Sequence, residues 1–408
     1  MRNRSGGFEL PVDSIKAFQP RIALLVDLAT SFGRRVLEGV HSHPARQNWE
    51  LLAESWGDVG AADLLEGDAP DGIIFDGQFS EILTSLTDLP CPQVDLSGVG
   101  PGSEASSVTA DFEQVAQVAA QHLRERGFLN IGFLGIPSSP ASAQMERSLG
   151  QACSHFARRF ERWQTPLDWS GQQKSAGRGL TEWLASLPRP CGVVAADDVA
   201  ARRLLQACRK LNLRVPQEIA VVGVGDYEMV TIVSDPTLSS VVIPARRIGY
   251  LAADCLECML QGGQARHLKL PAPSLAARRS TDLLAFEDEL LREALAWMHQ
   301  HLTDSVRMPQ LAEHLSVSRR LLEHHFQQSL GHGPAEQLRR LRLTRAEQLL
   351  RETDLGLASV AKMAGLGTAE RLCVLFRRHM DLTPGEYRRM LPPPVSPQFY
   401  SGSAQMRK

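Results

Sequence analysis

The sequence predicts an α/β domain built on parallel sheets, followed by an all-α domain with an internal repeat. Up to about residue 275, short runs rich in Val, Ile and Leu alternate with amphipathic helical patterns, which is typical of parallel strands covered by helices. From Glu287 onward the apolar positions follow a 3.6-residue period instead. A chain of 408 residues also exceeds the size of one ordinary core, so more than one domain is expected.

The strands and helices of the α/β part can be placed from these patterns. The predicted strands are residues 22–26, 51–53, 72–75, 94–96, 131–134, 192–195 and 220–224. The predicted helices are residues 33–43, 112–126, 199–211 and 245–260. We divide the chain into an N-terminal extension (1–20), the α/β domain (21–282), the all-α domain (283–395) and a polar tail (396–408).

Composition and charge limit the class of protein. The chain is 43% hydrophobic and 22% charged, as globular proteins are, and its seven scattered cysteines suit reduced thiols in the cytoplasm. Cys255 and Cys258 lack the second ligand pair of a zinc site, so we expect no metal, and no cofactor either. No run approaches the roughly 20 apolar residues of a membrane helix, so no membrane partner is expected. The net charge is −5 for residues 1–285 and +3 for residues 286–408, which permits nucleic-acid binding by the second part.

The all-α domain contains the internal repeat. Segment 311–318 recurs as segment 360–367, and each copy is followed by an apolar pair spaced four residues apart. These pairs are Leu322 with Phe326 and Leu372 with Phe376. Each copy fits two short helices joined by a tight turn, because a small residue occupies the turn and Ser or Thr follows it as a helix N-cap. The repeat therefore predicts two helix-turn-helix units.

The outward positions of each second helix are the candidate DNA-binding residues, because they can reach base edges and phosphates in a major groove. In the first unit they are Ser318, Arg319, Arg320, Glu323, His324 and Gln327. In the second unit the outward residues are Thr368, Ala369, Glu370, Arg371, Cys373 and Val374, of which the first four are the candidates. A solvated helix face is the alternative for one amphipathic helix, but the tandem repeat favours DNA recognition. The second set has few donors, so we expect it to contact phosphates and position the protein more than read bases.

Residues 334–351 are predicted to form one helix about 25 Å long, which can set the two units about one duplex turn (~34 Å) apart. Residues 290–390 resemble the DNA-binding domain of AraC-type regulators, on segments 346–350 and 376–388. Leu366 departs from the family, which usually has Phe there. The resemblance implies a transcription regulator that binds double-stranded DNA as a homodimer, and that contacts RNA polymerase if it is an activator.

Polar residues of the α/β domain lie at or just past the ends of predicted strands, where open parallel sheets bind ligands. Carboxylates there can accept hydrogen bonds from the hydroxyls of a small carbohydrate, and arginines can donate. The candidate ligand-binding residues are Asp27, Thr30, Phe32, Arg34, Asp111, Arg147, Asp197, Asp198 and Asp226. Asp111 and Asp198 directly precede predicted helices, so helix capping is their alternative role.

Residues 20–282 are similar to the sugar-binding domains of LacI-type regulators, and segments 36–40 and 278–282 also match sugar-operon regulators that carry an AraC-type tail. This resemblance implies a two-lobed periplasmic-binding-protein-like fold that closes around a small sugar effector such as a xylose-like pentose. The implied hinges are the crossovers near residues 108–111, 238–244 and 270–276. Segment 27–31 and Gly225 depart from the pattern of that cleft.

Two other classes of function are weighed against this one. The first is a sugar-modifying α/β enzyme with a helical appendage, and the second is a module whose helices contact protein. The chain has no Gly-x-Ser-x-Gly, no P-loop and no HExxH, and Gly223-x-Gly225 is not a dinucleotide fingerprint because Glu228 replaces the third glycine. We therefore expect no catalytic residues and a sequence-specific DNA-binding regulator, an activator, as the function.

Overall fold

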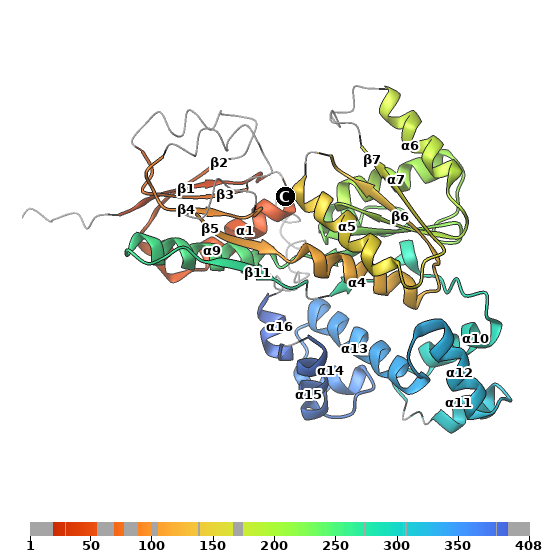
Figure 1. Ribbon diagram of the computed structural model, residues 1–408. Coiled ribbons are helices and arrows are strands. Elements are labelled where there is room, and N and C mark those ends of the chain that lie inside the picture. The colour runs from red at the N-terminus through yellow and green to blue at the C-terminus, as the bar shows by residue number, and fades with distance from the viewer. Residues whose placement is uncertain are drawn as a thin grey trace, which may run out of the picture.

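The computed structural model describes residues 19–28, 30–54, 69–76, 89–98, 105–137, 139–165, 174–272, 274–304, 306, 308–380 and 382–390. The polar tail and nearly all of the N-terminal extension lie outside these ranges. Two lobes, each built on a six-stranded sheet, stand side by side above a helical domain (Figure 1). Within the described ranges no helix is both long and apolar enough to cross a membrane.

The first lobe contains a fully parallel sheet in the order β11-β5-β4-β3-β1-β2. Its strands are β1 (Arg21–Leu25), β2 (Glu50–Glu54), β3 (Gly72–Phe75), β4 (Gln93–Asp95), β5 (Ser106–Ala110) and β11 (His267–Leu270). Its helices are α1 (Ser31–His41), a 3-10 turn (Pro44–Asn48) and α9 (Ala245–Leu260). Helices α1 and α9 cross closely because glycines meet at the crossing: a Cβ added to Gly39 would lie 2.0 Å from the carbonyl oxygen of Arg246.

The second lobe has the order β12-β10-β9-β8-β6-β7, parallel except where β12 pairs antiparallel with β10. Its strands are β6 (Asn130–Gly135), β7 (Arg159–Gln164), β8 (Cys191–Ala195), β9 (Ile219–Gly225), β10 (Ser239–Val242) and β12 (Leu275–Ala276). Its helices are α4 (Phe112–Glu125), α5 (Pro140–Cys153), α6 (Lys174–Ser186), α7 (Asp198–Lys210), α8 (Glu228–Thr231) and a 3-10 turn (Arg279–Thr281).

All the strands predicted from apolar runs are present, but the structure adds strands that the sequence did not reveal. Strands β7 and β11 are edge strands of their sheets, and exposed polar residues are mixed with less exposed ones along them, as in Arg159–Gln164. An edge strand needs no continuous apolar run, because solvent covers one side of it. The interior strands β5 and β10 are largely buried but were missed as well, because Ser and Thr interrupt their apolar runs. A strand such as Ile219–Gly225, which carries no polar side chain and is buried along its whole length, is the kind that the pattern shows.

The chain crosses between the lobes at three places. It leaves β5 of the first lobe for α4 of the second, returns from β10 to α9, and crosses again from β11 to β12. These crossings correspond to the hinge segments expected near residues 108–111, 238–244 and 270–276. A two-lobed domain joined by three neighbouring crossovers can open and close about them.

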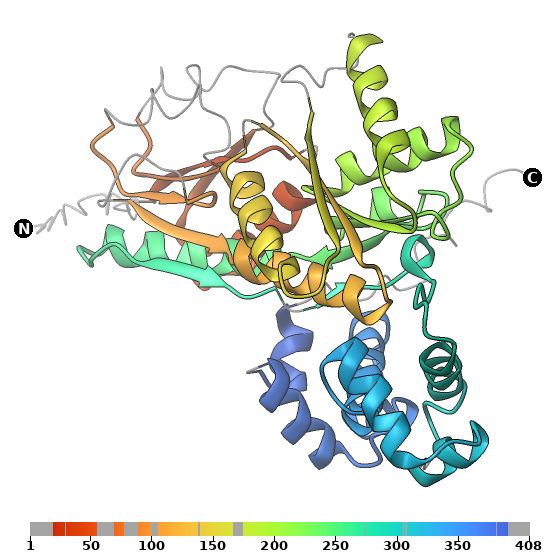
Figure 2. The same ribbon diagram turned by 45° about the vertical axis from the view of Figure 1, so that its right-hand side comes forward.

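The helical domain lies below the lobes and is drawn in teal to blue in Figure 2. Its helices are α10 (Glu289–Gln300), α11 (Met308–His314), α12 (Arg319–Leu330), α13 (Pro334–Glu352), α14 (Leu357–Met363), α15 (Ala369–Met380) and α16 (Pro384–Met390). The domain has two apolar cores, one around α10–α12 and one around α14–α16, and α13 contributes to both. The last strand ends at Ala276 and the first of these helices begins at Glu289.

Candidate DNA-binding surface and effector cleft

The first helix-turn-helix unit pairs α11 with α12. Its turn contains Ser316 in the left-handed region, with φ of 54°. Ser318 begins α12, and its hydroxyl accepts a hydrogen bond from the backbone N–H of Leu321 at 3.2 Å. Leu322 and Phe326 are fully buried, so the structure confirms the expected turn, cap and inward pair.

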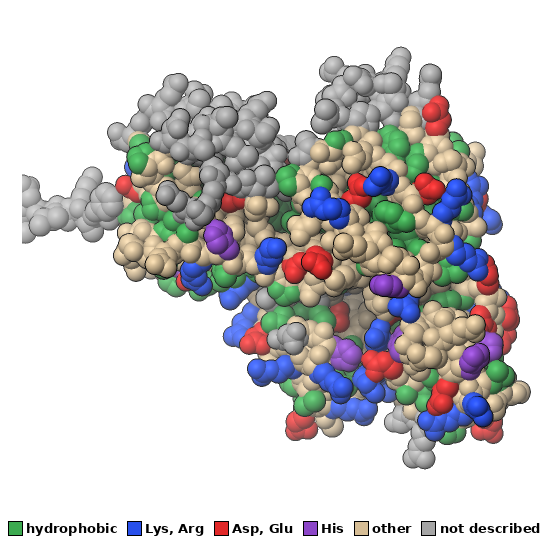
Figure 3. Space-filling view, viewed as in Figure 1, with side chains coloured by type: hydrophobic (Ala, Val, Ile, Leu, Met, Phe, Trp, Pro, Cys, Tyr) green, Lys and Arg blue, Asp and Glu red, His purple; other side chains and the backbone are tan. Residues whose placement is uncertain are grey.

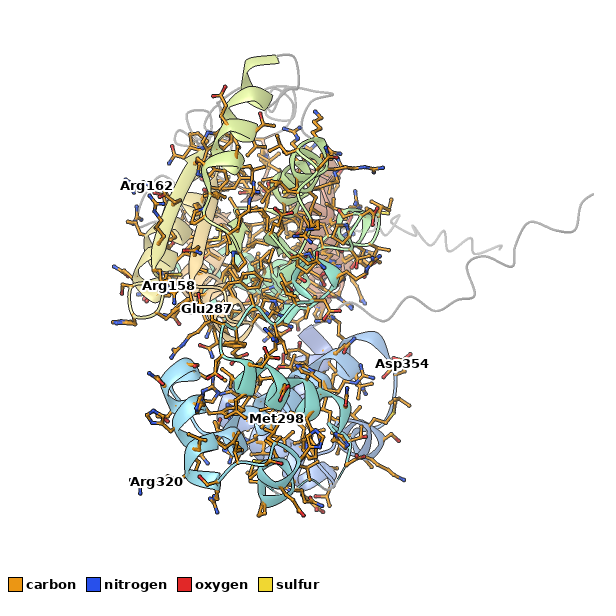
Figure 4. All side chains as sticks on the ribbon, turned by 90° about the vertical axis from the view of Figure 1, so that its right-hand side faces the viewer. Arg158, Arg162, Glu287, Met298, Arg320 and Asp354 are labelled. Carbon is orange, nitrogen blue, oxygen red and sulfur yellow. The ribbon has the colours of Figure 1, made fainter. Side chains whose placement is uncertain are left out.

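The opposite face of α12 is exposed to solvent, and Arg320 projects from the end of the helical domain that is remote from the lobes (Figure 4). The five candidate DNA-binding side chains that follow the cap all lie on this face: Arg319, Arg320, Glu323, His324 and Gln327. Arg319 Nε lies 2.8 Å from Glu323 Oε1. Both side chains are exposed, so this ion pair is weak and a phosphate or base can displace it.

The second unit repeats this geometry. Gly365 provides the left-handed turn with φ of 71°, and the hydroxyl of Thr368 accepts the N–H of Arg371 at 3.3 Å. Leu372 and Phe376 are fully buried. Of the predicted residues, Thr368, Glu370 and Arg371 are exposed, whereas Ala369 is partly buried. The repeat in the sequence is therefore a repeat in structure.

Helix α13 joins the units and is 19 residues long, which corresponds to about 28 Å. The 3.6-residue pattern of this helix predicts that Arg339, Arg340, Arg342 and Arg345 point largely outward, but in the structure all four are half-buried and bonded within the protein. Arg340 pairs with Glu125 of the α/β domain at 3.2 Å, and Arg342 donates to the carbonyl oxygen of Leu302 at 2.9 Å. These bonds fix the linker helix to the α/β domain and to the loop after α10. Figure 3 shows many other Lys and Arg side chains on the outer surface of the helical domain.

A cavity of about 240 Å³ lies between the two lobes. Its polar lining includes Asp27, Thr30 and Asp76 from the first lobe and Ser139 and Asp197 from the second. Its apolar lining includes Phe32, Phe112, Met145, Ile243 and Ile248. Carboxylates and apolar faces in one cleft suit a ligand that carries both hydroxyls and a C–H face.

Four of the nine predicted ligand-binding residues line this cavity: Asp27, Thr30, Phe32 and Asp197. The other five are not among its lining residues. Arg34 donates to the carbonyl oxygen of Leu28 at 3.0 Å, and Arg147 lies exposed on α5. The carboxylate of Asp111 caps α4, where it accepts the N–H groups of Glu113 and Gln114 at 3.1 Å each.

Asp198 and Asp226 do not line the cavity, and each carboxylate is held by hydrogen bonds or an ion pair within the second lobe. Asp198 is fully buried and accepts from the Ser240 hydroxyl at 2.6 Å and from the Tyr227 N–H at 2.7 Å. Asp226 pairs with Arg278 at 2.7 Å. Burial raises the pKa of Asp198 to about 7, against the lowering effect of its two donors. Both carboxylates therefore support the wall of the cleft on the second lobe.

Among the lining residues that the sequence did not single out are Asp76, Phe112 and Tyr227. Asp76 directly follows β3, so its position after a buried strand was an available signal. Burial, and then the charges of Asp197, Asp198 and Asp76, raise the pKa of Tyr227. Among the described residues, no group of three or more His, Cys, Asp or Glu side chains is arranged to hold a metal ion.

The third crossover contacts the helical domain directly. The hydroxyls of Ser274 and Tyr387 lie 2.6 Å apart, and both side chains are buried. The ring of Tyr387 packs edge-on against Phe376, with 5.1 Å between centroids. A hinge segment of the α/β domain is thus bonded to the core of the second helix-turn-helix unit. At the other end of the helical domain, Arg158 and Glu287 form an exposed ion pair (Figure 4).

Comparison with known proteins identifies the kind of each domain. Residues 120–281 match the model of a periplasmic binding protein-like domain, and residues 311–390 match that of a helix-turn-helix domain. The chain is 27% identical over 384 residues to the xylose operon regulatory protein of Escherichia coli K12, covering 90% of this chain and 96% of that one. Over 105 residues it is 34% identical to the transcriptional activator RhaS of Citrobacter koseri, which is 26% of this chain and 38% of that protein.

Solved structures agree with these matches. The structure of a xylose-binding transcription activator is 26% identical, with a TM-score of 0.58, and the match covers 92% of this chain and all of that one. A cellobiose complex of the regulator CelR is 22% identical with a TM-score of 0.54, over 64% of this chain and 84% of that one, and it shows the fold alone. The chain therefore combines a periplasmic-binding-protein-like domain with a helix-turn-helix domain of the AraC type, and it is similar to sugar-responsive transcription regulators over most of its length.

Proposed function

We propose that the protein is a cytoplasmic transcription activator that binds DNA as a homodimer under the control of a small neutral carbohydrate, a pentose such as xylose. The cavity between the lobes carries this proposal. Relatives named for the xylose operon, and a structure titled as xylose-binding, support the choice of sugar. The relatives are regulators and the chain carries helix-turn-helix units. Both observations favour a protein that binds the sugar over an enzyme that converts it.

The lining of the cavity supports a neutral polyol. Asp27, Asp76 and Asp197 offer carboxylate acceptors, and no Lys or Arg stands among the described residues that line it. A phosphorylated or acidic sugar would meet only like charge there, which costs binding free energy. Phe32 and Phe112 offer apolar faces to the C–H groups of a sugar ring.

Closure of the lobes is the step that we propose links sugar to DNA. A ligand held by both lobes favours the closed state, because only that state makes both sets of contacts. Arg35 of α1 and Glu228 of α8 already approach across the lobes at 3.6 Å. Movement of the crossovers would then reach the helical domain through Ser274 and Tyr387.

The surface also offers a site for a second copy of the chain. Met229, Ile232 and Val233 lie within five consecutive residues and are 60–71% exposed. A compact exposed apolar patch is typical of a protein contact, so we place the dimer interface of the proposed homodimer here. The activator role implies contact of the DNA-bound dimer with RNA polymerase.

A thermal-shift screen tests the effector. We expect one of xylose, arabinose, ribose, glucose or galactose to raise the Tm of the full chain, since a ligand that binds only the folded state stabilises it. Xylose 5-phosphate is the matched control and should give no shift. The sugar should be recovered unchanged after incubation. Stabilisation by none of the neutral sugars, or by the phosphate only, contradicts the proposal.

A further inference from the structure

The recognition helix of the second unit carries an exposed apolar side chain at its centre. Val374 is 67% exposed on α15. Phe376, two positions later, is fully buried, and two positions along an α-helix turn by about 200°. Val374 therefore points almost directly away from the core of the unit. A large apolar side chain gains nothing for folding in that position.

The internal repeat shows which residue of the first unit is equivalent to Val374. Val374 precedes the buried Phe376 by two residues, as His324 precedes Phe326 in the first unit. His324 is one of the exposed candidates for DNA contact on α12. The two units thus present different chemistry at the same place on equivalent helices, a hydrogen-bonding ring in one and an isopropyl group in the other.

The surroundings of Val374 fit DNA better than protein. Arg371 and Arg378 lie one turn before and one turn after it on the same face, and both are exposed. Among the described residues no carboxylate lies within ion-pair distance of either one. Two such arginines can each contact a phosphate, which would hold the face of α15 toward the base edges of a major groove.

In the major groove the apolar group that distinguishes one base pair from the others is the 5-methyl of thymine. We infer that Val374 packs against the 5-methyl group of a thymine, so that the second unit reads at least one A·T pair besides contacting phosphates. This inference rests on the proposed DNA-binding function. It also revises the expectation that the second unit mainly positions the protein, because reading a methyl group requires no hydrogen-bond donor.

The test begins with duplexes selected by the full chain from a randomised library. Each thymine of the selected site is then replaced by deoxyuridine, which removes only the methyl group. We expect one position in the half-site of the second unit where this change weakens binding about fourfold, as the loss of one buried methyl group implies. Val374→Ser should weaken binding to the thymine duplex by a similar factor and be insensitive to deoxyuridine at that position.

Met363→Ser is the matched control, because Met363 is also an exposed apolar residue of the second unit but lies on α14 and not on the recognition helix. It should keep the deoxyuridine effect at full size. The inference is overturned if no thymine methyl matters, or if Val374→Ser retains the wild-type deoxyuridine effect and selects the same site. Failure of the wild-type chain to enrich any sequence would also contradict the proposed function, so the two failures are distinguishable. A loss of partner-protein capture without any change in DNA selection would assign Val374 to a protein contact instead.

Discussion

Replacing Tyr387 with Phe removes one hydroxyl, and with it the 2.6 Å hydrogen bond to Ser274 on the third crossover. The ring and its packing against Phe376 remain, so the helical core should persist. A buried neutral hydrogen bond contributes about 1 kcal/mol, which corresponds to about fivefold in an equilibrium constant. If closure of the lobes makes or breaks this bond, the effect of sugar on DNA affinity should change by about that factor.

The assay is fluorescence anisotropy with a selected duplex, with and without the sugar that gives the largest thermal shift. The quantity compared is the ratio of the two dissociation constants, because this ratio is the coupling between the sites. Ser274→Ala should change the ratio as Tyr387→Phe does, and the double variant should change it no further. A ratio that is the same in the wild type and in all three variants would refute the proposed path from hinge to helical domain.

Three further predictions follow from the site. Arg319→Ala and Arg320→Ala should each weaken binding and lower the slope of log affinity against log salt by about one if the side chain contacts a phosphate; an unchanged slope together with unchanged affinity would remove α12 from the interface. Asp76→Asn should weaken sugar binding about tenfold or more in calorimetry, because a bond to a charged acceptor is lost, whereas Asp111→Ala, which removes the cap of α4, should lower only the Tm. The pKa of Asp198 is about 7 in the folded protein, above its ordinary value near 4, so between these values the folded state retains a proton that the unfolded chain has lost. The free energy of unfolding should therefore contain a component that falls as pH rises from about 4 to 7, and urea titrations of Asp198→Asn should lack it.

The sequence predicts the parts of the fold that apolar patterning controls. Central strands such as β9 are buried throughout, and the inward pairs of the two recognition helices repeat at a fixed spacing. Edge strand β7 escaped prediction because four of its six residues are polar and every residue remains at least partly exposed. Such a strand is held in its sheet by backbone hydrogen bonds to the neighbouring strand, and the side-chain pattern does not reveal these bonds.

The ligand cleft was predicted less well than the recognition helices. An acidic residue after a strand can face the cleft, as Asp76 does, or cap the next helix, as Asp111 does. Which of the two roles an acidic residue takes depends on the position of the second lobe relative to the first. That position is set by contacts between residues far apart in the sequence. In each recognition helix the buried Phe shows which side of the helix faces the core. The outward positions could therefore be predicted from the sequence of the helix alone.

The central claim is that a small sugar, bound between the lobes, controls DNA binding by the helical domain. Titrating the stabilising sugar into the full chain bound to its selected duplex tests it most directly, with anisotropy as the readout. We expect DNA affinity to shift at least severalfold over the concentration range in which the sugar raises the Tm, and Asp76→Asn to move both responses to higher sugar concentration together. DNA affinity that stays constant while the sugar saturates the protein would contradict this control of DNA binding by the sugar.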